Sequence, residues 1–272
     1  MPDRLFYESH CHTPLCHHAV GQPEDYAEAA FSRGLNGGII TCHCPLPDGF
    51  SRNVRMAPEE FDLYVGMVER AREAWAGRVD VRLGLESDFY PGVEGWLEKL
   101  HARVPLHHVL GSVHHHVQDY RDLYFDGDVF AYQQTYFEHL AAAAESGLFD
   151  TLAHPDLIKN EDPSEWDFRR IQPFIERALD RIAAAGVAME LNTSGRYKIL
   201  PEINPGPEML ALMASRGIPV VLGADAHHPD RVGDGFPEAL DALEAAGYAK
   251  VSLFLDRKRH DLLIPEVRAS LA

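Results

Sequence analysis

Short apolar runs alternate with longer amphipathic segments along the 272 residues of this chain. The apolar runs have the length of buried strands, and each ends in polar residues before the next amphipathic segment begins. They comprise residues 5–7, 37–41, 81–85, 108–113, 151–153, 187–191, 219–222 and 251–255. The unit of strand, polar terminus and helix therefore repeats about seven times.

Proline and glycine mark the limits of the predicted helices. Pro23 begins a helix that stops at Gly34, and Pro58 begins another that stops before Gly77. The helical segment 164–185 is expected to bend or break near Pro173, because proline has no backbone N–H to donate. After residue 255 we expect a basic, fraying tail.

This order of elements predicts the fold class. Continuous apolar strands that alternate with amphipathic helices indicate an α/β protein, with a parallel sheet and helices outside it. The chain length and the number of units favour a barrel over an open sheet. Because no repeat, linker or low-complexity tract divides the sequence, we expect a single domain over residues 1–272.

Composition narrows the choice of partner. The hydrophobic content of 46% is enough for a full core. The formal charge of -17 argues against nucleic acid as the main partner, because such binding requires basic surface, and it favours a small or cationic substrate. We expect a soluble, cytoplasmic protein, since neither a leader nor a membrane span is visible. The sequence leaves the oligomeric state open.

Histidine and carboxylate residues gather where the predicted strands end. In a barrel of this kind, the functional site lies at the carboxyl ends of the strands. Each of the following residues comes just after an apolar strand or in the loop beyond it: His10, His12, His18, His43, Glu86, His114, His154, Asp225 and His227. We therefore expect these side chains to meet in one pocket.

The chemistry of this set points to metal ions. Imidazole nitrogen and carboxylate oxygen bind Zn, Mn and Fe, and nine ligands are too many for one tetrahedral ion. They suit two or three ions, with Glu86 able to bridge through both oxygens. Clustered ions activate water and clamp the oxygens of an in-line displacement, so hydrolysis is expected, with phosphate esters foremost.

The cysteines allow a non-enzymatic alternative. Cys11, Cys16, Cys42 and Cys44 all lie in the first 44 residues, interleaved with histidines. In a reducing compartment they are expected to be free thiols or metal neighbours rather than disulfides. A structural zinc module in this region would instead have closed four-coordinate sites, and it would unfold on chelation.

Six motifs together resemble a known family. They are His10-Cys11-His12-Thr13-Pro14-Leu15-Cys16-His17-His18-Ala19, Leu85-Glu86-Ser87-Asp88, Gly111-Ser112-Val113-His114, Ala153-His154-Pro155-Asp156, Asn192-Thr193-Ser194-Gly195 and Ala224-Asp225-Ala226-His227. As a set they resemble the polymerase and histidinol phosphatase (PHP) family, especially its histidinol-phosphate phosphatase branch. The resemblance implies a distorted (β/α)7 TIM-like barrel whose trinuclear site hydrolyses L-histidinol phosphate to L-histidinol and phosphate, a step of histidine biosynthesis.

The resemblance also assigns ligands to two or three divalent ions (Zn, Mn or Fe). It implies a first ion held by His10, His12, Glu86 and Asp225, a second by Glu86, His114 and His154, and a third by His18, His43 and His227. Cys42 stands where the family commonly has aspartate. Its sulfur either favours Zn or Fe over Mn or points away from the ions.

A mechanism follows in outline. We expect a metal-bridging hydroxide to attack phosphorus in line, with Glu86 and Asp225 in the catalytic centre. The candidate phosphate contacts are Arg55, Ser112, Arg196 and Lys198. The candidate proton donors to the leaving alkoxide are His115, His116 and His228. Asp88 and Asp156 are expected to hold ligand histidines in one tautomer.

Two other enzyme classes fit a site of this kind. The same family includes nuclease domains, so a phosphodiesterase or 3'-5' exonuclease is the main alternative, although the acidic charge counts against it. An amidohydrolase-like enzyme that cleaves C–N bonds is the other, since activated water does not itself specify the electrophile.

Overall fold

The computed structural model describes residues 4–271. Nine strands form one sheet in the order of the sequence, and neighbours from β1 to β8 are parallel. The strands are β1 (Tyr7–Cys11), β2 (Gly37–Ile40), β3 (Asp80–Asp88), β4 (His108–Ser112), β5 (Thr151–Leu152), β6 (Ala188–Asn192), β7 (Val220–Gly223), β8 (Lys250–Leu255) and β9 (Lys258–Leu263). The predicted α/β class with a parallel sheet is confirmed.

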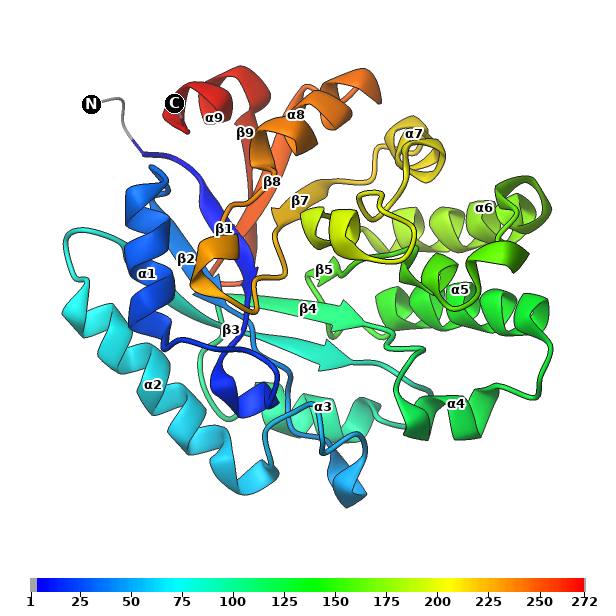
Figure 1. The fold of residues 1–272 in the computed structure, drawn as a ribbon, viewed down its shortest axis with the longest axis horizontal. Coiled ribbons are helices and arrows are strands. Elements are labelled where there is room, and N and C mark those ends of the chain that lie inside the picture. Colours follow the sequence, from blue (N-terminus) through cyan, green and yellow to red (C-terminus); the bar gives the residue numbers. More distant parts are fainter. Residues whose placement is uncertain (1–3, 272) are drawn as a thin grey trace.

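Helices surround the strands. They are α1 (Pro23–Ser32), α2 (Phe61–Ala74), α3 (Glu94–His101), α4 (Gln118–Tyr124), α5 (Val129–Glu145), α6 (Phe168–Ala185), α7 (Pro207–Ser215), α8 (Phe236–Ala245) and α9 (Ile264–Ser270). Helices α1 and α2 lie on one side of the strands and α5 and α6 on the other (Figure 1). Within residues 4–271, no helix combines the length and apolar character that a membrane crossing requires.

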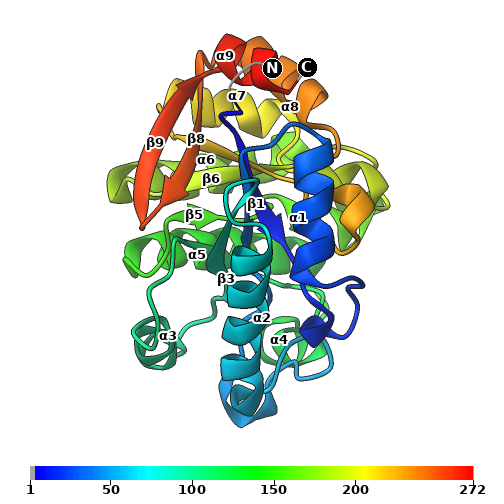
Figure 2. The same cartoon turned by 90° about the vertical axis from the view of Figure 1, so that its left-hand side faces the viewer.

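The first and seventh strands close the barrel. The amide of His12 donates to the carbonyl of Ala226 over 3.0 Å, and the amide of Ala226 donates to the carbonyl of His10 over 2.9 Å. The buried carboxylate of Glu8 strengthens this junction, because it accepts hydrogen bonds from the amides of Ala224 and Gly233. The result is a distorted seven-stranded TIM-like barrel, with β8 and β9 continuing beyond the closure (Figure 2).

The predicted fraying tail is wrong. Strand β9 pairs antiparallel with β8, and Ile264 and Val267 of α9 belong to the hydrophobic core. The turn uses Asp256 and Arg257 with φ of 52° and 60°, whereas glycine is the usual signal for such a turn. Because β9 is mostly exposed, its sequence also lacks the apolar pattern of a buried strand.

Of the predicted bend or break near Pro173, the break is wrong. Helix α6 runs unbroken from Phe168 to Ala185 with Pro173 inside it. The helix begins after Asp167, whose side chain caps it by accepting from the amides of Arg169 and Arg170. Pro173 therefore removes one donor from the first turns without ending the helix.

Candidate metal centre

The nine predicted ligands meet at the carboxyl ends of the barrel strands. His10 lies in β1 and Glu86 in β3, and the others lie in the loops that follow β1, β2, β4, β5 and β7. Six of them line a pocket of about 330 Å³, namely His18, His43, His114, His154, Asp225 and His227. Most of its walls come from these ligands and from four neighbours, Val54, Arg55, His116 and Lys198.

A first donor group combines residues from the N-terminal and C-terminal parts of the chain. Nε2 of His12 lies 3.1 Å from Oδ1 of Asp225 and 3.7 Å from Oε2 of Glu86. Nε2 of His10 lies 3.4 Å from the same Glu86 oxygen and 3.7 Å from the same Asp225 oxygen. Two imidazoles and two carboxylates thus face one point.

Glu86 faces a different group through each of its oxygens. Oε2 lies near His10 and His12 and 2.8 Å from Nδ1 of His43. Oε1 instead lies 3.3 Å from Nε2 of His114 and 3.0 Å from Nε2 of His154. This is the geometry that a carboxylate bridging two ions requires.

A third group of imidazoles lies beside the first. The ring centroid of His18 lies 4.5 Å from that of His227 and 5.4 Å from that of His43. Backbone carbonyls contact the Nδ1 atoms of two of these rings, at 2.6 Å for His18 and 3.1 Å for His227. Their Nε2 atoms are therefore the ones free to act as ligands.

Unpaired polar atoms test whether these residues fit metal ions. Nε2 of His10, Oε2 of Glu86 and Nε2 of His227 are buried and lack a hydrogen-bond partner among the described residues. Buried polar atoms nearly always have a hydrogen-bond partner. These three atoms belong to the groups of neighbouring His and Glu side chains, and each can donate a lone pair to a metal ion. The donor set, imidazole nitrogen with carboxylate oxygen, therefore fits divalent ions.

The protonation states of the histidines and carboxylates in the centre depend on each other. Burial opposes protonation of His10, but the carboxylates of Glu190, Asp225 and Glu86 outweigh it and raise the pKa of His10 well above its usual value. Burial also opposes ionisation of Glu86, but the surrounding histidines hold its pKa well below the usual range. Glu86 is therefore ionised at neutral pH.

Two buried carboxylates orient ligand histidines. Oε1 of Glu190 lies 2.7 Å from Nδ1 of His10, and Oδ1 of Asp88 lies 3.0 Å from Nδ1 of His114. Burial alone would lower the pKa of His114, but Asp88 and Glu86 raise it to about 10. Such contacts fix the ring orientation of a ligand histidine.

The contact of Asp88 with a ligand histidine was predicted from the sequence, but that of Glu190 was not. A signal was present, because Glu190 interrupts the apolar run 187–191. The structure also shows why Gly223 faces it: a Cβ at that position would lie 2.0 Å from Oε1 of Glu190.

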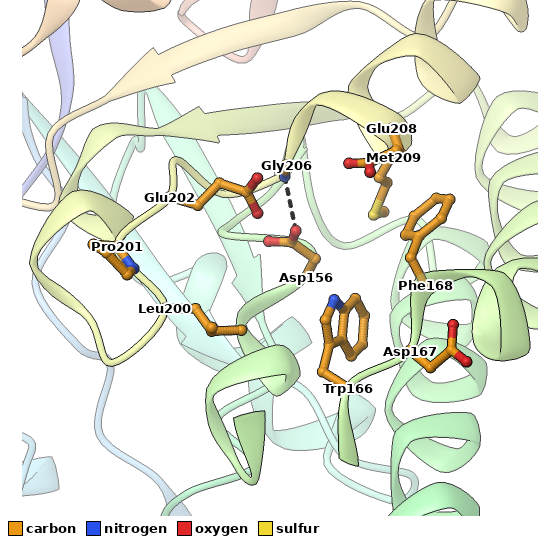
Figure 3. A pocket seen from close by; sticks show the side chains of 10 residues that line it. All are labelled: Asp156, Trp166, Asp167, Phe168, Leu200, Pro201, Glu202, Gly206, Glu208 and Met209. Atoms are coloured by element: carbon orange, nitrogen blue, oxygen red, sulfur yellow. Dashed lines mark hydrogen bonds between the residues drawn. The ribbon is translucent and has the colours of Figure 1, made fainter. Parts of the chain in front are cut away.

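Asp156 does not have the predicted tautomer-holding role. Its Oδ2 accepts from the Lys159 ammonium over 2.9 Å and from the Gly206 amide over 2.8 Å. Figure 3 shows Asp156 in a second pocket, of about 470 Å³, together with Trp166 and Glu202. It therefore braces the loops after β5 and β6.

The predicted phosphate contacts separate into two kinds. Lys198 lines the metal pocket, and no carboxylate of residues 4–271 forms a salt bridge with its ammonium. Arg55 is 2% exposed, and its guanidinium is held by Asp88 with an Nη2–Oδ2 distance of 2.6 Å. The structure therefore does not support Arg55 as a phosphate contact, although its side chain reaches the pocket wall.

Ser112 and Arg196 are also engaged elsewhere. Oγ of Ser112 lies 3.5 Å from Asp88 and 3.4 Å from Nδ1 of His114, which places it behind the ligand. Nη2 of Arg196 lies 3.1 Å from Asp234. Neither side chain lines the metal pocket.

The predicted proton donors lie in three different places. His115 faces away from the pocket, with Nε2 3.6 Å from Glu161 and its ring against Tyr136. His116 lines the pocket and is exposed to solvent. His228 is exposed at an adjoining pocket of about 260 Å³, which Lys198 and Asp225 also line.

The four cysteines are free and buried, as expected. Thr13 donates to the sulfur of Cys42 from its amide over 3.4 Å and from its hydroxyl over 3.2 Å. Cys42 nevertheless lies at the edge of the centre, because its sulfur, that of Cys16 and a ring nitrogen of His12 lie within 4.8 Å of one another.

Several known proteins are similar to this chain in sequence or in fold. The PHP domain matches residues 8–194. A probable histidinol-phosphatase of Deinococcus radiodurans is 38% identical over 260 residues, which cover 92% of this chain and 97% of that protein. The histidinol-phosphatase of Bacillus subtilis is 23% identical over 269 residues, covering 86% and 98% of the two chains.

Among solved structures, the histidinol phosphate phosphatase of Lactococcus lactis, complexed with zinc, L-histidinol and phosphate, superposes with a TM-score of 0.76. It is 17% identical in sequence and covers 94% of this chain and 98% of its own. At this identity the match shows that the fold is shared.

Proposed function

The chain belongs to the PHP domain family, and from that premise we propose that it is a metal-dependent phosphatase that hydrolyses L-histidinol phosphate to L-histidinol and phosphate. The similarity to a probable histidinol-phosphatase over nearly the whole length supports this substrate. The observation that carries the proposal is the placement of Glu86, whose two oxygens face two separate groups of imidazoles.

We assign the ligands by these groups. His10, His12, Glu86 and Asp225 would hold one divalent ion, Glu86, His114 and His154 a second, and His18, His43 and His227 a third. Zinc, manganese and iron all suit such donors. When bound, divalent ions lower the pKa of coordinated water and neutralise charge on the phosphoryl oxygens.

Side chains around the pocket are the proposed phosphate contact, proton donor and orienting groups. The Lys198 ammonium reaches the pocket without a carboxylate partner, so it is the proposed contact for the phosphate group. His228 is the proposed proton donor to the leaving alkoxide, because its exposed imidazole shares the adjoining pocket with Lys198. Asp88 and Glu190 keep the ligand rings oriented.

Phosphate release from a panel of small phosphomonoesters tests the substrate. L-histidinol phosphate should give the highest kcat/KM, and single-stranded DNA should not be degraded. A higher kcat/KM on another ester would overturn the substrate assignment, and degradation of DNA would indicate the exonuclease alternative.

A pair of variants in one loop tests the phosphate contact. Lys198→Ala should lower kcat/KM for histidinol phosphate by about tenfold to a hundredfold, the range for a charged hydrogen bond. Arg196→Ala is the matched control, because that cation is paired with Asp234, and it should change kcat/KM by less than about threefold. Equal losses in both variants would contradict the role of Lys198.

A further inference from the structure

Cys16 lies beside the imidazoles of His18 and His227. It ends a short 3₁₀ turn, Pro14–Cys16, and the next residue, His17, has a left-handed backbone with φ of 66°. This bend directs the side chains on both sides of His17 toward the centre. The sulfur of Cys16 and ring nitrogens of His18 and His227 consequently lie within 4.8 Å of one another.

The two imidazoles next to Cys16 are prepared to act as ligands. The carbonyl of Cys16 itself contacts Nδ1 of His18 at 2.6 Å, which leaves Nε2 of that ring available. Nε2 of His227 is buried and has no hydrogen-bond partner among residues 4–271. The side chain of Cys16 is fully buried beside them. One sulfur and two nitrogens therefore form a donor set of the kind that zinc prefers.

Cys42 differs from Cys16 in its contacts. Both the amide and the hydroxyl of Thr13 donate to the sulfur of Cys42, and this sulfur lies 3.7 Å from the carbonyl of Thr13. Cys42 shares a donor group with His12 and Cys16, but not with His18 or His227. Of the two thiols, Cys16 is thus the one aligned with the third group of imidazoles.

We propose that Cys16 is a sulfur ligand of the ion held by His18 and His227. On binding, the thiol releases its proton to solvent and the thiolate coordinates the cation. A thiolate is a softer donor than the carboxylates of the other two groups, so this position selects zinc or iron over manganese. The inference rests on the proposed metal centre but not on the identity of the substrate.

Cobalt substitution tests this ligand without measuring activity. The full-length protein, stripped of metal and loaded with Co²⁺, should show the near-ultraviolet charge-transfer band of a thiolate–cobalt bond. Cys16→Ser should lose the band, while Cys42→Ser and the buried control Cys44→Ser should keep it. A triple variant with serine at positions 11, 42 and 44 retains Cys16 as its only cysteine, and it should also keep the band.

Each result separates the possibilities. Full cobalt loading without the band in the wild-type protein would overturn the proposal, and so would a band that persists in Cys16→Ser or disappears in the triple variant. If Cys16→Ser does not fold, the wild-type protein and the triple variant still decide the question. A wild-type protein that binds no cobalt would instead refute the metal centre, and with it the proposed function.

Discussion

At the scale of single residues, Glu86 determines how the donor groups are connected. It is fully buried in β3, and its oxygens contact imidazoles that arise from four different strand ends. Within the described chain, no second carboxylate has this position between the groups.

Replacement of this residue should therefore affect all of the chemistry. Glu86→Gln keeps the shape but removes the charge and one oxygen, so turnover should fall to the background rate and metal content should decrease. Phosphate release and elemental analysis measure the two effects. Glu202→Gln, which alters a half-exposed carboxylate paired with Lys159, is the control. Full activity in Glu86→Gln would refute the bridging role.

Glu190 acts through His10 rather than on the substrate. Besides its contact with His10, it accepts from the amide of His154 over 2.8 Å and from the side chain of Asn192 over 2.9 Å. Glu190→Gln should weaken metal binding by about tenfold to a hundredfold, as loss of an orienting contact typically does. Competition with a chromophoric chelator measures the affinity. Unchanged affinity would limit Glu190 to a role in stability.

The sequence predicted the positions of the metal donors better than the roles of the surrounding residues. The histidines could be found because each follows an apolar run. The role of Arg55 could not, because its carboxylate partner, Asp88, is 33 positions away, and nothing local shows that the charge is neutralised. Likewise, nothing in the run His114-His115-His116 shows which rings turn toward the pocket.

At the scale of elements, β4 carries a histidine that has no part in the metal centre. His108 is fully buried, with Nε2 2.9 Å from the hydroxyl of Thr151 in β5 and its ring stacked on Phe254 of β8. Burial, together with nearby positive charge, lowers the pKa of His108 to about 3. The ring is therefore neutral in the folded protein.

This residue should make the fold sensitive to acid. Between the usual pKa of 6.5 and the folded value of about 3, the unfolded chain binds a proton at His108 that the folded chain does not. Its contribution is therefore fully present above about pH 6.5 and is lost as the pH falls, to a limit of a few kcal/mol.

The variant His108→Gln removes this titration. Urea unfolding of the metal-free protein between pH 7 and pH 4 should show a shallower loss of stability in His108→Gln than in the wild type. Gln can still hydrogen-bond to Thr151, which keeps the comparison fair. Parallel pH profiles in the two proteins would contradict the prediction.

Buried strands are easier to predict from the hydrophobic pattern than exposed strands are. Most of the parallel strands could be predicted because they are buried and contain short apolar runs. The β8–β9 hairpin could not, because β9 presents Lys258, Arg259 and His260 to solvent and therefore reads as a polar tail. The pairing of β9 with β8 and the contact of α9 with the core fix that segment.

At the scale of the whole molecule, the hydrophobic core extends far beyond the donor groups. The core extends continuously from Phe6 at the start of β1 to Val267 in α9. The metal donors occupy one end of the barrel above it. The fold therefore has a source of stability that does not depend on bound ions.

Chelation should distinguish this arrangement from a structural zinc module. Treatment with EDTA should abolish phosphate release while the far-ultraviolet circular dichroism at 25 °C stays unchanged. The Tm should fall, because ions that bind only the folded state stabilise it, and added zinc or manganese should restore activity. Loss of the dichroism signal on chelation would support the structural module instead.

The closure between β1 and β7 also determines when the protein can acquire its ions during biosynthesis. His12 and Asp225 lie 213 positions apart in the chain. A ribosome therefore releases His10 and His12 well before their carboxylate partner, Asp225. For the proposed metal centre, an ion held by both His12 and Asp225 is consequently expected to bind only after the seventh strand has been made, so the ions available to the folded chain rather than to the nascent one would decide its composition.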